Sequence, residues 1–159
     1  MSFDPNRIAI EYYFGDLQYW KLPGIAANAL EEGFDGASIR RLAGLANLGR
    51  GGIREDDIRP SEVDSAFCEM GVDAPIAEEK ARLVLAIESA NKAVHGPSNV
   101  FDEATYIRIH LCHLSEPPET LRRIVNLSKE SMNAPPSQWN RIETDLKDAF
   151  AEFLVGQKA

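Results

Sequence analysis

Apolar residues along the chain recur three or four positions apart, which is the spacing of one face of an α-helix. The clearest stripe lies in residues 38–48, where Ile39, Leu42, Ala43 and Leu45 fall on one side. No segment alternates apolar and polar residues for long, and β-branched residues are scattered, so strands are not expected. The pattern therefore predicts an all-α fold.

Proline and glycine mark where these helices begin and end. A proline lacks only an N–H group that would be unpaired in a first helical turn, and glycine readily adopts the left-handed conformation that ends a helix. Prolines stand where a helical pattern starts at Pro23, Pro60, Pro75, Pro118 and Pro136, and glycines follow one at Gly33, Gly71, Gly96 and Gly156. The sequence predicts helices over 6–20, 23–32, 38–48, 61–70, 75–95, 98–114, 118–132 and 136–155.

A chain of 159 residues is expected to form one domain. We expect a single orthogonally packed bundle of seven or eight helices over residues 1–159. The longest predicted loop, 47–59, is rich in glycine and contains the acidic run Glu55, Asp56 and Asp57. We interpret it as a mobile connector, and as the place where the domain would subdivide.

The net charge of the chain favours some classes of binding partner over others. It carries 25 acidic and 17 basic residues, a formal net charge of −8. This balance repels nucleic-acid phosphates and anionic lipid head groups, and it suits a basic protein partner. No apolar run approaches the length of a membrane span, and residues 1–7 do not resemble a signal peptide. With Cys68 and Cys112 expected as free thiols, the sequence predicts a cytoplasmic protein.

The start of the chain is unusually aromatic. The segment 6–20 is apolar nearly all round, which means contacts on more than one side. Either it passes through the centre of the domain or part of it meets a partner, and aromatic side chains with a polar tip are favoured at interfaces. Tyr12, Tyr19 and Trp20 are the candidate partner-binding residues. No catalytic signature or cofactor motif is present, so a non-enzymatic binding module is the leading hypothesis.

A metal-binding helical protein is the first alternative. Glu103 and His110 lie two turns apart on one predicted helix, and His113 is offset from His110 by about 60°. Three such side chains could ligate Zn²⁺ or Fe²⁺, although the HExxH pattern is absent. The competing interpretation is a helix end at which histidine is favoured by the helix dipole.

A helix-turn-helix DNA-binding regulator is the second alternative. Ala29, Gly33, Ile39 and Leu42 have the spacing with which two helices pack about a tight turn. Arg40 and Arg41 would then be the DNA-binding residues on the exposed side of the second helix. Acidic residues in the same unit oppose DNA binding, and a simple helix hairpin explains the same pattern.

The stretch from Leu22 to Leu45 runs LPGIAANALEEGFDGASIRRLAGL. It resembles a pattern found in small all-helical bacterial proteins of unassigned function, and the resemblance extends over about half the chain. It implies a bacterial helical domain and no activity. Some small acidic helical proteins act as immunity or antitoxin-like partners of basic toxins, and by that analogy the partner expected here is a basic protein.

Overall fold

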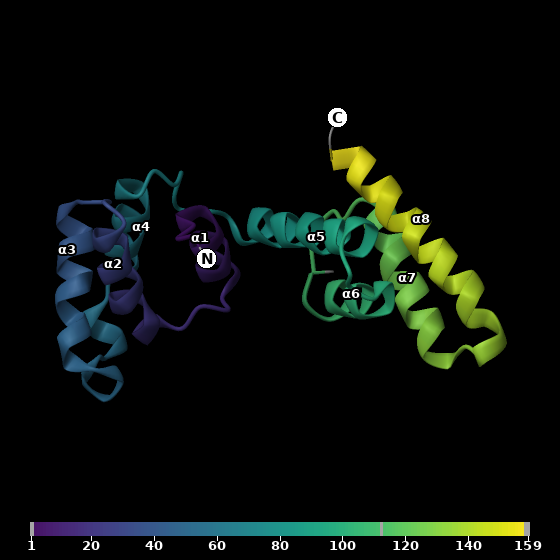
Figure 1. Ribbon diagram of the computed structural model, residues 1–159, viewed down its shortest axis with the longest axis horizontal. Coiled ribbons are helices and arrows are strands. Elements are labelled where there is room, and N and C mark those ends of the chain that lie inside the picture. Colours follow the sequence, from purple (N-terminus) through teal and green to yellow (C-terminus); the bar gives the residue numbers. More distant parts are fainter. Residues whose placement is uncertain (1, 112, 158–159) are drawn as a thin grey trace. The chain divides into compact units, whose positions relative to one another are not determined.

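The computed structural model describes residues 2–111 and 113–157. Within these ranges the chain forms eight α-helices and no strands, which confirms the predicted all-α fold (Figure 1). Cys112, one of the two expected free thiols, lies outside the described residues. Cys68 is an exposed free cysteine. No helix in the described ranges is both long enough and apolar enough to cross a membrane.

The chain divides into two compact units, Met1–Ala81 (unit 1) and Arg82–Ala159 (unit 2). The division falls within a helix and not in the segment 47–59, where the sequence suggests a subdivision. That segment belongs to unit 1 because Ile53 and Ile58 are buried in the core of this unit. Three short 3₁₀ turns, Leu45–Leu48, Arg50–Gly52 and Glu55–Asp57, make up most of it.

Unit 1 contains α1 (Pro5–Phe14), α2 (Leu22–Glu31), α3 (Ala37–Gly44) and α4 (Pro60–Glu69). Helix α3 packs against both α2 and α4. Their buried faces share a core of small and large apolar side chains, among them Ala26, Ala29, Ile39, Leu42, Val63, Ala66 and Phe67. Alanines on α2 let the neighbouring helix approach closely, and Phe67 fills the space between the elements.

The first predicted helix, 6–20, is in fact two elements. Helix α1 starts at its N-cap Asp4, whose carboxylate accepts a hydrogen bond from the Arg7 N–H at 3.2 Å. It ends at Gly15, which has φ +103°, a conformation that a residue with a Cβ atom rarely adopts. The chain resumes as a 3₁₀ turn, Tyr19–Lys21, that leads directly into α2. Tyr12 and Tyr19 therefore lie on different elements.

Helix α3 takes its N-terminal cap from another helix. The Glu69 carboxylate, at the end of α4, accepts hydrogen bonds from the backbone N–H groups of Ser38 (3.2 Å) and Ile39 (2.9 Å). The residue that precedes α3, Gly36, has no side chain to offer these groups. An acidic side chain at a helix start is favourable both as an acceptor and through the helix dipole. The contact ties α3 to α4.

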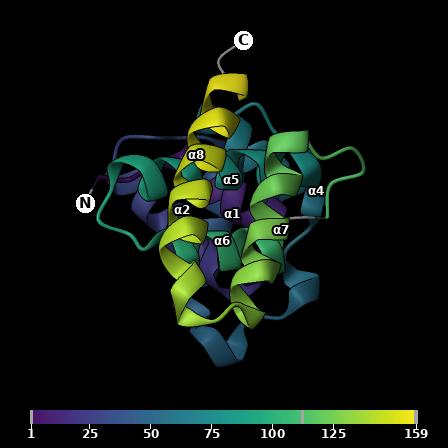
Figure 2. The ribbon, with the colours of Figure 1, turned by 90° about the vertical axis from the view of Figure 1, so that its right-hand side faces the viewer.

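Unit 2 contains most of α5 (Glu78–His95), then α6 (Val100–Tyr106), α7 (Glu119–Asn133) and α8 (Trp139–Gln157). Helices α7 and α8 pack side by side (Figure 2), and both contact α6. The core consists of fully buried side chains such as Ile107, Leu111, Ile124, Ile142, Leu146, Phe150 and Phe153. The predicted helix 98–114 changes character after Tyr106, where a π-helical turn, Ile107–Leu111, begins.

Candidate functional site

Unit 1 has a pocket of about 520 Å³, a volume in the range of ligand-binding sites. It lies among the end of α1, the Tyr19–Lys21 turn with the start of α2, and the acidic turn that leads into α4. Its lining is Tyr12, Leu17, Tyr19, Leu22, Glu55, Asp56, Ile58, Arg59 and Pro60. Glu55, Asp56, Arg59 and Pro60 are exposed, so the pocket opens to solvent on that side.

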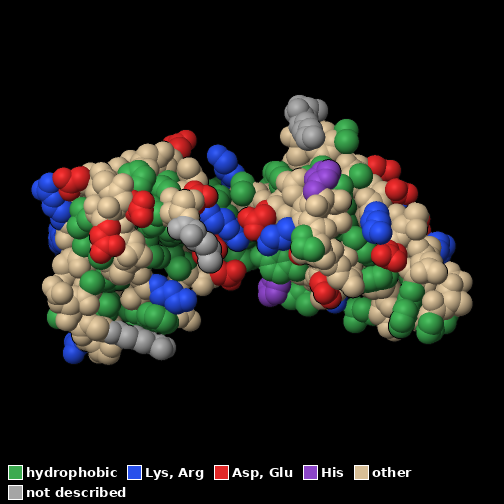
Figure 3. All heavy atoms as spheres, in the orientation of Figure 1, with side chains coloured by type: hydrophobic (Ala, Val, Ile, Leu, Met, Phe, Trp, Pro, Cys, Tyr) green, Lys and Arg blue, Asp and Glu red, His purple; other side chains and the backbone are tan. Residues whose placement is uncertain are grey.

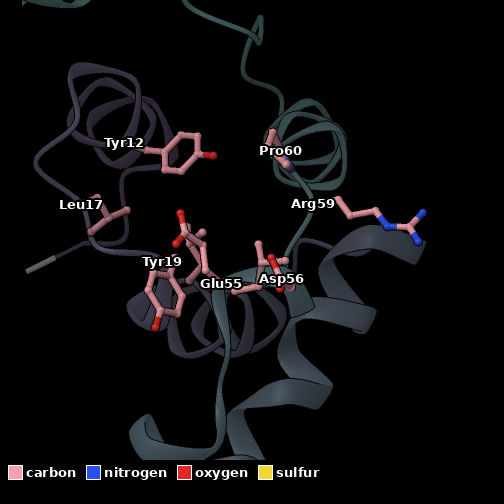
Figure 4. Close-up of a pocket in the computed structure, with 9 residues that line it drawn as sticks. Tyr12, Leu17, Tyr19, Glu55, Asp56, Arg59 and Pro60 are labelled. Carbon is pink, nitrogen blue, oxygen red and sulfur yellow. The ribbon is translucent and has the colours of Figure 1, made fainter.

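Aromatic and acidic side chains face each other across this pocket (Figure 4). Tyr12, Leu17 and Tyr19 form one side, Asp56 and Pro60 lie across from them, and the Tyr12 hydroxyl points into the space between. The Glu55 carboxylate extends toward Tyr12 and Leu17. The Arg59 guanidinium extends away from the pocket. The lining thus brings two carboxylates to the pocket, and its one guanidinium points elsewhere.

The break in the chain at Gly15 produces the aromatic side. Tyr12 is on the last turn of α1, and the reversal after Gly15 brings Leu17 and Tyr19 back beside it. Tyr12 also packs on Phe67, with 5.7 Å between ring centroids, which fixes its ring against the core. A continuous helix over 6–20 would instead have spaced these side chains along one helix axis. The pocket wall thus depends on one left-handed glycine.

The acidic side is a short turn with its own internal cap. The Arg54 N–H donates to the Asp57 carboxylate at 2.9 Å, and the Asp57 N–H donates to the Arg54 carbonyl at 3.0 Å. Asp57 is thereby used to close the turn. The side chains of Glu55 and Asp56 make no hydrogen bond or ion pair with any described residue, so their carboxylate oxygens remain available to a ligand. The sequence predicts a mobile connector for this acidic run, whereas the structure places Glu55 and Asp56 in the lining of the pocket.

The isoleucines that flank the acidic run are the sequence feature from which its fixed position could have been predicted. Ile53 and Ile58 are 6% and 8% exposed, so both ends of the acidic run are anchored in the core. Two large apolar residues bracketing three acids predict a fixed turn that displays its carboxylates. A freely moving linker would have no reason to place isoleucine at both ends.

The neighbouring Tyr13 does not line the pocket, and its hydroxyl donates a hydrogen bond to the Asp64 carboxylate on α4. Burial, then this hydrogen bond and the Asp64 charge, raise the pKa of Tyr13 well above its ordinary value. Burial and the same charge also raise the pKa of Tyr12. At neutral pH the Tyr12 hydroxyl in the pocket is therefore protonated and can both donate and accept.

Two of the three predicted partner-binding residues line this pocket, and the third does not. Tyr12 and Tyr19 are partly buried against the unit 1 core and still present surface to the pocket. Trp20 is absent from the lining, and the Lys21 ammonium lies 5.3 Å from the centre of its ring. That arrangement is a local cation–π contact.

The predicted metal ligands are not brought together. Among the described residues no group of three or more His, Cys, Asp or Glu side chains could hold a metal ion. Glu103 accepts a hydrogen bond from the buried Ser89 hydroxyl, and His110 packs on Tyr106 with 5.2 Å between ring centroids. The π turn explains the difference from the predicted alignment, because its i→i+5 hydrogen bonds change the rotation per residue that an α-helix would have.

The predicted DNA-binding arginines are both paired with acids. The Arg40 guanidinium forms two hydrogen bonds with Asp35, from Nε (2.7 Å) and Nη2 (2.5 Å). Arg41 Nε lies 3.4 Å from a carboxylate oxygen of Glu62. Helices α2 and α3 do pack as a hairpin, and Gly33 in the connection has φ +96°. With both charges matched locally, no observation favours the DNA-binding hypothesis over the simple hairpin.

Basic and acidic side chains intermingle over the face drawn in Figure 3, in each unit. The negative excess of the chain does not form one large patch on that face. The pocket differs because neither the Glu55 nor the Asp56 carboxylate forms an ion pair with a described residue.

No protein-family model matches the chain, and neither a curated protein nor a solved structure shows a significant similarity to it. Its function is therefore inferred from its own residues.

Proposed function

We propose that the protein is a non-enzymatic binding module that captures a basic protein partner, and that the pocket of unit 1 receives a cationic side chain of that partner. The observation that carries the proposal is the pair of carboxylates, Glu55 and Asp56, displayed in a pocket whose other wall is aromatic and apolar. The net charge of −8 supports the same type of partner.

The pocket suits a side chain that is apolar along its stem and charged at its tip. Leu17, Leu22 and Ile58 supply apolar surface for methylene groups. The rings of Tyr12 and Tyr19 offer faces that attract a cation. The Glu55 carboxylate, which extends toward Tyr12 and Leu17, and that of Asp56 then meet the charged tip. Aromatic anchors and charge pairs coincide in the same way at protein interfaces.

This capture would take place in the cytoplasm, where Cys68 stays reduced. An immunity- or antitoxin-like role is one form of the proposal, with a basic toxin as the partner. Such a partner would be held in an inactive complex, and the long-range attraction between opposite charges would speed its capture.

The test compares two variants that change the charge of the protein by the same amount. Glu55→Gln with Asp56→Asn neutralises the pocket. Glu31→Gln with Glu32→Gln neutralises another consecutive exposed pair in unit 1, which does not line the pocket. Each is used as bait in a nuclease-treated lysate of the organism that encodes the protein, and captured proteins are identified by mass spectrometry.

We expect the wild type and the Glu31/Glu32 variant to capture the same basic protein in stoichiometric amount, and the pocket variant to lose it. Equal capture by all three would show that the pocket is not the site. A pocket variant with a lower melting temperature but unchanged capture would show that Glu55 and Asp56 serve only to stabilise the nearby start of α4 through the helix dipole.

A further inference from the structure

Three oxygen-bearing groups converge on the pocket without a partner among the described residues. They are the carboxylates of Glu55 and Asp56 and the hydroxyl of Tyr12, none of which makes a side-chain hydrogen bond there. The carboxylates only accept, and the hydroxyl can accept as well as donate. The occupant that satisfies all three must therefore supply several N–H or O–H donors from one head group.

A guanidinium and an ammonium meet this demand differently. Guanidinium is planar, carries five N–H donors in a fixed fork, stacks on aromatic faces and is weakly hydrated. Ammonium has three donors around a point charge and holds its water strongly. Two carboxylates from consecutive residues, beside tyrosine rings, match the flat fork, because its donors diverge toward separate acceptors while its face lies on a ring.

Arg59, the basic residue of the lining, does not occupy the pocket with its own side chain. Arg59 belongs to the lining, and its guanidinium extends away from the pocket. Asp57, which could have added a third carboxylate, is bound to the Arg54 N–H. The lining thus offers two unpaired carboxylates, Glu55 and Asp56, and the neutral hydroxyl of Tyr12.

We infer that the pocket of unit 1 is selective for arginine, so that an arginine side chain of the basic partner enters it in preference to lysine. This inference rests on the proposed function and specifies the residue that is recognised. The guanidinium lies over the Tyr19 ring, donates to Glu55 and Asp56, and donates one N–H to the Tyr12 oxygen. The three methylene groups of the arginine pack on Leu17 and Ile58.

The test uses two short peptides of glycine and serine that differ only at a central residue, arginine in one and lysine in the other. Each is titrated at low ionic strength into the full-length protein, and the ring resonances of Tyr12 and Tyr19 are followed by NMR. We expect saturable shifts, with the arginine peptide bound about tenfold more tightly. The Glu55/Asp56 variant should lose both responses, and the Glu31/Glu32 variant should keep them.

A second variant isolates the hydroxyl. Tyr12→Phe keeps the ring on Phe67 and removes only the oxygen. It should weaken the arginine peptide about fivefold and the lysine peptide less. Equal affinity for the two peptides, or tighter binding of lysine, would overturn arginine selectivity while leaving the proposed function intact. Absence of saturable shifts with either peptide would also overturn it, and the proposed function would then be judged on whether partner capture depends on Glu55 and Asp56.

Discussion

The carboxylate of Glu69 occupies the space that a side chain at Gly36 would need. A Cβ atom built on Gly36 would lie 2.2 Å from Cδ of Glu69, far closer than two carbon atoms can approach. Gly36 itself is in an extended conformation open to any residue, with φ 172°. Its lack of a side chain is therefore required by the neighbouring carboxylate and not by its own backbone.

We expect Glu69→Ala to lower the free energy of unfolding by about 1–2 kcal/mol, because the Ser38 and Ile39 N–H groups lose their acceptor. Gly36→Ala should cost a similar amount, since Glu69 must swing away and abandon the same hydrogen bonds. The double variant should cost no more than Glu69→Ala alone. Urea unfolding of the four proteins measures the coupling, and additive losses would show that the two residues act independently.

The two glycines Gly15 and Gly24 should respond to alanine in opposite directions. Gly15 has φ +103°, so Gly15→Ala should lower the free energy of unfolding by about 1–2 kcal/mol. Gly24 lies in α2 with no atom within 4 Å of an added Cβ, so Gly24→Ala should raise it by about 0.4–1 kcal/mol. Thermal unfolding by circular dichroism checks both. A neutral Gly15→Ala would mean that α1 does not end in the left-handed conformation.

Alkaline pH should weaken unit 1 through Tyr13. Its folded-state pKa is raised by burial and by the hydrogen bond to Asp64, whereas an unfolded tyrosine ionises at about pH 10. Below that pH, Tyr13 is protonated in both the folded and the unfolded state, and its contribution to stability is fully present. As pH rises further the unfolded chain loses its proton first, so the free energy of unfolding falls. Denaturant melts from pH 8 to 11 should show this decline, and Tyr13→Phe should make it shallower.

We expect Zn²⁺ to leave the melting temperature unchanged, because Glu103 is bound to Ser89 and no metal-holding group occurs in the described ranges. Ser89→Ala should lower the free energy of unfolding by about 1 kcal/mol, since the partly buried Glu103 loses its donor. A rise in melting temperature with stoichiometric Zn²⁺ that disappears in a His110→Ala/His113→Ala variant would instead establish the predicted metal site.

The sequence predicts the helices well where their ends are encoded locally. Pro60 is the first residue of α4, and Gly71, with φ +84°, follows its end. The prediction fails at Gly15, which lies in a run of apolar residues whose periodicity hides the stop. It also fails at Pro136, which begins a 3₁₀ turn ahead of α8. A proline is compatible with either kind of first turn, so its presence alone does not distinguish them.

The candidate site is only half visible in the sequence. Tyr12 and Tyr19 stand out as aromatic residues with a polar tip, and both line the pocket. Glu55 and Asp56 do not stand out, because an acidic run in a glycine-rich segment has the composition of any solvated loop. Their proximity to Tyr12 depends on contacts between residues more than 40 positions apart in the chain, and no local pattern encodes such contacts.

The cap on α3 comes from Glu69, which is 31 and 30 positions beyond Ser38 and Ile39, whose N–H groups it binds. During synthesis, a nascent chain can form α2 and α3 before Glu69 has left the ribosome, but the start of α3 then has unpaired N–H groups. We expect this hairpin to fray at that end until α4 has emerged. The start of α3 would thus become ordered only when α4 emerges, so that the last helix of unit 1 stabilises one that was synthesised before it.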